Sequence, residues 1–178
     1  MYMDTSRARI VAFVTLLCAL LAVACGDDPT GPDNPGRLAV RLTDAPIQQV
    51  TSVNVYIEGL KVKRVGEPEQ RFAVDIGVVD LLELEDSTML LAEAAVEVGE
   101  YEYIMVELDQ ERSNLLIGAD QVGIRIPSEK IKVFGPFEVD TDGVTVVTLD
   151  FDAAESLRQL GNGDWLMTPI IVMLGVQG

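Results

Sequence analysis

Apolar and polar residues alternate with a period of two along most of the chain after residue 36. Every second residue is apolar in 38–42 and again in 53–57, and after Gly59 the phase shifts so that Leu60 and Val62 become the apolar positions. Alternation of this kind is typical of half-buried β-strands, and a glycine at a change of phase indicates a β-bulge. The pattern therefore predicts two strands here, the second interrupted by a bulge at Gly59.

The same pattern predicts further strands, separated by glycine, proline and aspartate. They cover residues 71–76, 101–109, 121–126, 131–139, 144–151 and 165–175. Short strands at this spacing favour a sandwich or a barrel of antiparallel sheets. We predict an all-β fold, an antiparallel β-sandwich of immunoglobulin or transthyretin type, with one or two short helices.

Two segments do not follow the strand pattern. Residues 153–160, with Asp152 as a candidate N-cap and Gly161 at the end, predict a short helix. Residues 81–96 are rich in leucine, glutamate and alanine, which favours a helix, but a polar interruption at 86–88 divides them. We expect a loop or strand end there, followed by a helical turn around residues 90–95.

The N-terminus has the features of an export signal. Arg7 and Arg9 precede fifteen residues without a charge, 10–24, a run shorter than the roughly 20 residues that a membrane-spanning helix needs. The run ends in Ala22-Val23-Ala24-Cys25, which resembles the lipobox of bacterial lipoproteins. The resemblance implies cleavage after residue 24 and acyl chains on Cys25. A plain signal peptide or an uncleaved N-terminal anchor is the alternative.

The predicted domain organisation has three parts. Residues 1–24 form a lipoprotein signal peptide, 25–36 the lipidated cysteine and a flexible tether rich in Pro, Gly and Asp, and 37–178 the β-sandwich domain. In lipoproteins an aspartate directly after the cysteine favours retention at the inner membrane. Gly26 occupies that position here, so we expect a cell-envelope protein held at the outer membrane by its acyl chains.

Composition excludes several classes of chemistry. The 178 residues include 13 basic and 29 acidic ones, no histidine and two cysteines, for a net charge of −16. Catalytic triads and imidazole metal ligands need histidine, and nucleic-acid binding needs cations that neutralise phosphates. Removing residues 1–24 takes away Cys18, Arg7, Arg9 and Asp4, which leaves a net charge of −17. We therefore expect no nucleic-acid partner and no catalytic thiol.

Several segments carry a family resemblance, spread in order over residues 36–175. They are GRLAVRLTDAP at 36–46, VNVYI at 53–57, VDLLEL at 79–84, GEY at 99–101, LDFD followed by AAES at 149–156, and PII at 169–171. The chain resembles the bacterial lipoprotein domains that are grouped as domain of unknown function 4382. The resemblance implies a β-rich, sandwich-like fold and brings no established activity.

The acidic residues suggest a calcium-binding site, but their number also has a simpler explanation. Residues 67–112 contain 14 acidic residues against Arg71 and Arg112, and calcium takes six to eight oxygen ligands. Solvation of an exposed domain is the explanation we favour, because the charges are spread over many elements. The candidates for a Ca²⁺ site are Asp140, Asp142, Asp150 and Asp152. Asp140 and Asp142 also fit a hairpin turn closed by Gly143, and Asp152 also fits a helix cap.

Aromatic residues suggest a surface for glycans. Tyr56 and Tyr103 lie among polar neighbours and are the candidates for ligand binding through solvent-facing rings. Tyr101 instead resembles a tyrosine corner, whose hydroxyl group fixes a loop. Lys61 and Lys63, with the neighbouring Arg64, form a basic cluster whose simplest interpretation is a solvated strand face.

These observations predict a binding or structural role without catalysis. The alternatives are a calcium-stabilised adhesin, a glycan-binding module or, less well supported, a glycoside hydrolase with two facing carboxylates.

Overall fold

The computed structural model describes residues 35–44, 50–74 and 76–178. The predicted signal peptide, Cys25 and nearly all of the predicted tether lie outside these residues, as do Ala45 and Pro46. All described residues belong to one compact unit, Pro32–Gly178.

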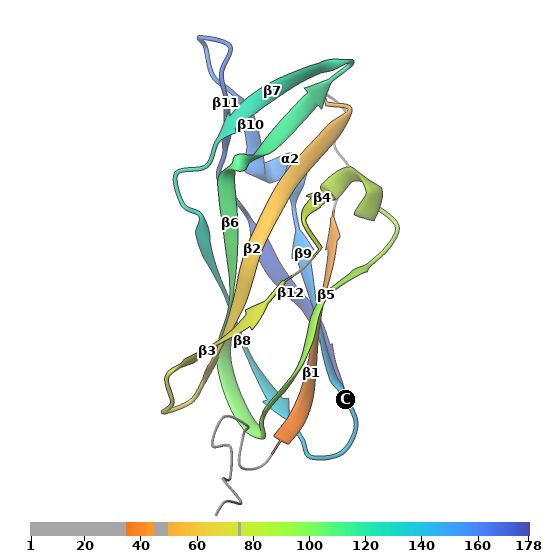
Figure 1. The fold of residues 1–178 in the computed structure, drawn as a ribbon, viewed down its shortest axis with the longest axis vertical. Coiled ribbons are helices and arrows are strands. Elements are labelled where there is room, and N and C mark those ends of the chain that lie inside the picture. Colours follow the sequence, from red (N-terminus) through yellow and green to blue (C-terminus); the bar gives the residue numbers. More distant parts are fainter. Residues whose placement is uncertain (1–34, 45–49, 75) are drawn as a thin grey trace, which may run out of the picture. The chain divides into compact units, whose positions relative to one another are not determined.

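Four strands form the first sheet, in the order β12-β9-β1-β5 (Figure 1). Their bounds are β1 Pro35–Asp44, β5 Met89–Glu97, β9 Thr145–Phe151 and β12 Ile171–Gln177. β1 pairs antiparallel with β5 but parallel with β9, in a register that places Leu38 opposite Thr145 and Leu42 opposite Leu149. The first strand of the domain therefore lies inside this sheet, next to a strand that comes about a hundred residues later.

The second sheet is built around the 19-residue strand β6, Gly99–Ile117. β6 pairs on one side with β2 and on the other with β8 and β7, and the sheet continues from β2 to β3 and β4 and from β7 to β11 and β10. The bounds are β2 Ser52–Arg64, β3 Glu69–Ala73, β4 Val78–Asp80, β7 Asp120–Arg125, β8 Lys130–Val139, β10 Leu157–Gln159 and β11 Trp165–Met167. The pairing of β7 with β11 is parallel.

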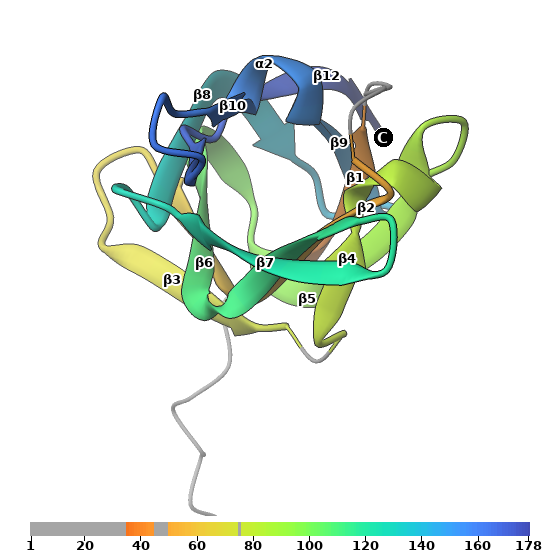
Figure 2. The same cartoon turned by 90° about the horizontal axis from the view of Figure 1, so that it is seen from above.

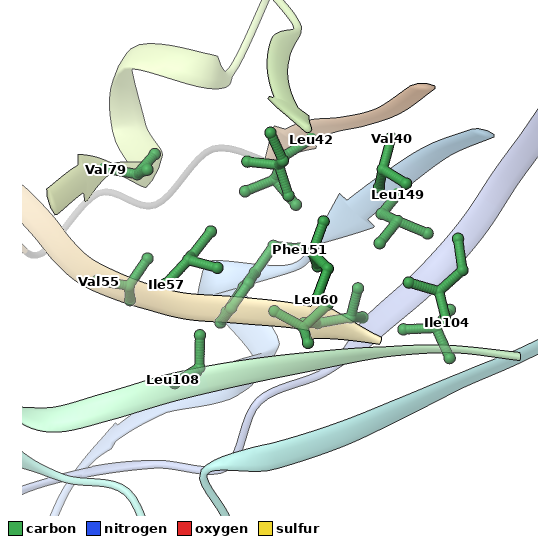
Figure 3. Packing of buried hydrophobic residues seen from close by; sticks show 14 of the residues in the cluster. Val40, Leu42, Val55, Ile57, Leu60, Val79, Ile104, Leu108, Leu149 and Phe151 are labelled. Carbon is green, nitrogen blue, oxygen red and sulfur yellow. The ribbon is translucent and has the colours of Figure 1, made fainter. Parts of the chain in front are cut away.

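The two sheets enclose one hydrophobic core. Seen from above, β1 and β9 lie on one side of the interior and β3 and β6 on the other (Figure 2). Alternate residues of each strand point inwards, so Leu42 and Phe151 of the first sheet meet Ile57, Leu60 and Ile104 of the second (Figure 3). The prediction of an all-β sandwich is confirmed, with two parallel pairs among otherwise antiparallel strands.

Local features of the second sheet agree with the sequence pattern. The register of β2 against β6 shifts between Ile57 and Gly59, which confirms the bulge. The Tyr101 hydroxyl group donates a hydrogen bond of 2.6 Å to the carbonyl oxygen of Glu97, as expected for a tyrosine corner. Burial raises the pKa of this hydroxyl group, which therefore stays protonated as a donor.

Two helix predictions need correction. Residues 90–95 are not a helical turn but part of β5, because pairing with β1 supplies hydrogen bonds that outweigh the helix preference of Leu, Ala and Glu. The helix at 153–160 is shorter than predicted. Helix α2 covers Ala153–Ser156, and Leu157 then enters β10. A 3₁₀ helix, η2, covers Leu81–Leu84, and its N-cap Asp80 accepts a hydrogen bond from the Leu82 amide.

Two strand predictions also differ from the structure. The stretch 165–175 is divided into β11 and β12 by residues 168–170. Residues 140–143 do not close a hairpin, because β8 pairs with β6 in one sheet and β9 pairs with β1 and β12 in the other. The segment instead carries the chain from one sheet to the other, and Gly143 adopts the positive φ of 86° that the turn requires.

Candidate functional site

All four lysines of the chain gather on the outer surface of the second sheet. Lys61 and Lys63 lie on β2, and Lys130 and Lys132 lie on β8, with β6 between the two strands. Because side chains alternate across a strand, the residues between the lysines, such as Val62 and Ile131, point towards the core. Two segments about 70 residues apart in sequence therefore place their cations on one surface.

We call this surface the lysine face. Its members occupy three rows across β3, β2, β6 and β8. The rows are Glu69, Lys63, Tyr103 and Phe134, then Arg71, Lys61, Met105 and Lys132, then Ala73, Gly59, Glu107 and Lys130. Five cations and two carboxylates give the face a net charge of +3, opposite in sign to the chain as a whole.

Glu107 holds the centre of the lysine face. Its side chain is only 6% exposed, although it points away from the hydrophobic core. Its Oε1 lies 2.8 Å from Lys61 Nζ and 3.9 Å from Lys130 Nζ, and its Oε2 lies 3.2 Å from Arg71 Nη2. Three cations around one buried carboxylate compensate for its desolvation and fix the positions of the basic side chains.

Gly59 makes room for one of these ion pairs. A Cβ atom at this position would lie 3.0 Å from Arg71 Nη2 and 3.1 Å from Arg71 Nε. The guanidinium group of Arg71 thus crosses the strand above Gly59 and reaches Glu107 on the next strand. The glycine that follows the bulge in β2 therefore provides the space through which Arg71 crosses the face.

A second set of contacts surrounds Tyr103. Its hydroxyl group donates a 2.6 Å hydrogen bond to Glu69 Oε1 and accepts one of 3.0 Å from Lys132 Nζ, which also lies 4.3 Å from the centre of the ring. The hydrogen bond from Tyr103 holds the pKa of Glu69 below its ordinary value, and the bond to the hydroxyl group raises the pKa of Lys132. Both groups are therefore charged at neutral pH.

Comparison with known proteins gives one match. The family model described as "Domain of unknown function (DUF4382)" matches residues 35–169. The chain belongs to this family. The match covers nearly all of the described domain, including every member of the lysine face. Neither the curated proteins nor the solved structures contain a match to the chain.

Two tyrosines of the DUF4382 domain were candidates for a solvent-facing platform. Tyr103 is buried, with 6% of its surface exposed, so the expectation of a solvent-facing ring is wrong for this residue. Tyr56 is half-buried, and the guanidinium carbon of Arg112 lies 3.5 Å from the centre of its ring. Polar neighbours in sequence suggested exposure, but long side chains from adjacent strands cover both rings.

The four aspartate candidates do not come together. Asp140 and Asp142 are exposed in the turn between the sheets, whereas Asp150 lies in β9, and Asp152 Oδ1 accepts a 2.9 Å hydrogen bond from the Glu155 amide as the N-cap of α2. Within the described part of the chain, no three acidic residues are close enough to hold a metal ion.

Asp150 gives a prediction about pH. Partial burial, and then the charge of Asp152, raises the pKa of Asp150 above its ordinary value of 3.8. The folded state therefore holds this proton more tightly than the unfolded chain, and stability falls as pH rises from the unfolded pKa through the folded one. We expect Asp150→Asn to raise the Tm at pH 7 by about 1–2 °C, with no gain below about pH 3.5.

Thermal denaturation monitored by circular dichroism at several pH values measures this effect. Asp140→Asn removes the same charge from an exposed turn and serves as the control. If both variants raised the Tm equally at every pH, the effect could not be attributed to the raised pKa of Asp150.

A surface pocket of about 250 Å³ lies beside the β2–β3 hairpin of the DUF4382 domain. Its lining includes Arg64, Glu67, Glu97 and Tyr101. The guanidinium group of Arg64 bonds to both carboxylates, at 2.5 Å from Glu97 and 3.4 Å from Glu67. Glu67 and Glu97 are thus held by a shared cation, whereas Glu69, which also lines this pocket, accepts the hydrogen bond from Tyr103.

The sequence interpretation left out most of the lysine face. Arg71, Glu107, Lys130, Lys132 and Phe134 were not singled out as site residues. One signal could have found part of the set, because the Lys-x-Lys spacing occurs at 61–63 and again at 130–132 and these are the only lysines of the chain.

Proposed function

We propose that this chain is a lipid-anchored protein of the bacterial cell envelope whose β-sandwich domain acts by binding, with the lysine face as the binding surface. The lysine face carries this proposal. A chain with a net charge of −16 has all four of its lysines on one surface, where the buried Glu107 carboxylate holds Lys61 and the Tyr103 hydroxyl group holds Lys132. Fixed cations of this kind favour anionic ligands.

The proposed anchor is Cys25. The supporting observation is the sequence Ala22-Val23-Ala24-Cys25 at the end of an uncharged run. Two or three acyl chains on this cysteine would hold the protein permanently, since a single chain binds only marginally. Gly26 after the cysteine supports placement at the outer membrane. No helix in the described ranges is long and apolar enough to cross a membrane.

The other functions receive less support. A calcium-stabilised adhesin would use clustered carboxylates, and the candidate aspartates form two separate pairs, Asp140 with Asp142 in the turn and Asp150 with Asp152 at the end of β9. A glycoside hydrolase would use two carboxylates in different environments across a cleft. The lysine face is the more specific feature of the described domain, so we favour binding.

Cysteine substitutions test the anchor. We expect Cys25→Ala to move the protein from the membrane fraction to the soluble envelope fraction, because no acyl chain can then be attached. Cys18→Ala is the matched control, since this cysteine lies within the predicted signal peptide and should leave membrane attachment unchanged. The measurement is cell fractionation followed by immunoblotting. Equal incorporation of labelled palmitate into the Cys25→Ala chain and the unchanged chain would refute lipid anchoring at Cys25, and the size of the chain on the blot shows whether residues 1–24 have been removed.

A further inference from the structure

We infer that the lysine face binds a linear polysaccharide that carries carboxylate groups. The inference rests on the proposed binding role and names its ligand class. Three properties of the face support it: the arrangement of its cations, the acidic residues around it and the exposed ring of Phe134.

The cations form a grid of a size that suits an extended polymer. Residues two apart in a strand are about 7 Å apart, and β2 and β8 are separated by two strand spacings of about 4.8 Å. Lys61 and Lys132 therefore start from opposite ends of one row, about 10 Å apart, whereas Lys63 and Lys130 start from the rows on either side of it, each about 7 Å along its own strand. A chain of charged sugars lying across the strands can meet cations on both β2 and β8.

The two central lysines are held in place before a ligand arrives. Lys61 Nζ lies 2.8 Å from Glu107, and Lys132 Nζ donates to the Tyr103 hydroxyl group. Ordering a free lysine side chain costs conformational entropy on binding, and these contacts reduce that cost. Lys130 is 67% exposed and keeps its ammonium group accessible to a ligand.

Acidic residues around the lysine face limit the shape of the ligand. Glu58, Glu67, Glu102 and Glu129 are exposed next to it in sequence or in the sheet. Charges act over about 8 Å at physiological salt, so a broad anionic surface, such as a membrane or a nucleic-acid duplex, would meet these carboxylates as well as the lysines. A narrow single chain can contact the cations alone.

Phe134 provides the apolar part of the site. Its side chain is 70% exposed in the middle of β8, and its ring packs edge-on against Tyr103, with 5.4 Å between ring centres. The neighbouring ring fixes an apolar surface beside the lysines. The carbon–hydrogen faces of sugar rings pack against such surfaces, whereas phosphate chains have no group that would use one. Charge and aromatic ring together favour an acidic sugar polymer.

Binding of polygalacturonate tests the inference. The mature lipidated chain in a neutral detergent is titrated with polygalacturonate, with its uncharged methyl ester and with polyphosphate, and binding is measured by calorimetry. We expect polygalacturonate to bind more weakly as salt increases, and the methyl ester to show at least about tenfold lower affinity. Lys63→Gln/Lys130→Gln and Phe134→Ala should each weaken binding by about five- to tenfold.

Controls separate the outcomes. Arg37→Gln/Arg158→Gln makes the same charge change away from the face and should leave affinity within about twofold of the original. Equal weakening by this control, or unchanged binding by Phe134→Ala, would overturn the inference. Lysine-dependent binding of polyphosphate alone would overturn the glycan assignment but support the binding role. No binding to any of the three polymers would refute both, leaving the Cys25 anchor to its own test.

Discussion

Replacing Phe151 with alanine is expected to lower the free energy of unfolding by about 3–5 kcal/mol. Phe151 ends β9 and is completely buried, and its ring contacts the interiors of both sheets (Figure 3). Alanine would lose the transfer free energy of the ring and leave a cavity that strands paired on both sides of β9 cannot close. Urea denaturation followed by tryptophan fluorescence measures the change, with an unaltered slope expected against urea concentration.

Phe134→Ala provides the matched control for this experiment. It makes the same chemical change at a side chain that is 70% exposed and has one ring contact. We expect a loss below about 1 kcal/mol. Similar losses at the two positions would show that Phe151 does not lie in the core.

Removing the charge of Glu107 is expected to cost about 2–3 kcal/mol. Glu107→Gln keeps the shape of the side chain but leaves Lys61, Arg71 and Lys130 close together without the carboxylate that compensates them. The cost stays below that of breaking a fully buried pair because Arg71 and Lys130 are more than half exposed and recover some hydration. Urea denaturation at neutral pH measures the loss.

Two further variants make the Glu107 experiment specific. Glu93→Gln removes a carboxylate paired with the exposed Arg37 and should cost less than about 1 kcal/mol. Glu107→Gln/Lys61→Gln should recover part of the loss, because one of the uncompensated cations is then absent. The proposed role of Glu107 would be wrong if Glu107→Gln/Lys61→Gln lost more free energy of unfolding than Glu107→Gln and Lys61→Gln lose when their separate losses are added.

Much of the fold follows from the sequence because burial on one side of a strand determines the pattern. Positions such as Leu38, Leu42 and Leu149 repeat every second residue, and these residues form the core. The partner of each strand does not follow in the same way. Nothing in residues 38–42 indicates that β1 pairs in parallel with β9, because the inward pattern is the same for either direction.

The segment 89–97 shows where local preference fails. Leucine, alanine and glutamate have high intrinsic helix propensity, yet this segment forms an edge strand that pairs with β1. The stabilising hydrogen bonds and apolar contacts come from β1, whose residues lie 47 to 62 positions away in sequence from their partners. A propensity read over a short window contains no information about them.

The candidate site was partly missed for the same reason. Lys61 and Lys63 were visible as a basic cluster, but their meaning depends on Lys130 and Lys132, which reach the same surface only because β6 pairs with both β2 and β8. Tyr103 was expected at the surface, and it is buried because Lys132 covers its ring and Phe134 packs against its edge.

The parallel pairing of β1 with β9 also constrains the order in which the chain can fold. Synthesis from the N-terminus produces β1 first. One of its two neighbours in the sheet, β9, is made only when residues 145–151 are added. Contacts between distant segments form slowly, since a long loop must close before they contribute. The N-terminal half alone therefore cannot complete the four-stranded sheet. If the protein is exported as an unfolded chain, this sheet can be completed only after residues 145–151 have been synthesised and have reached the same compartment as β1.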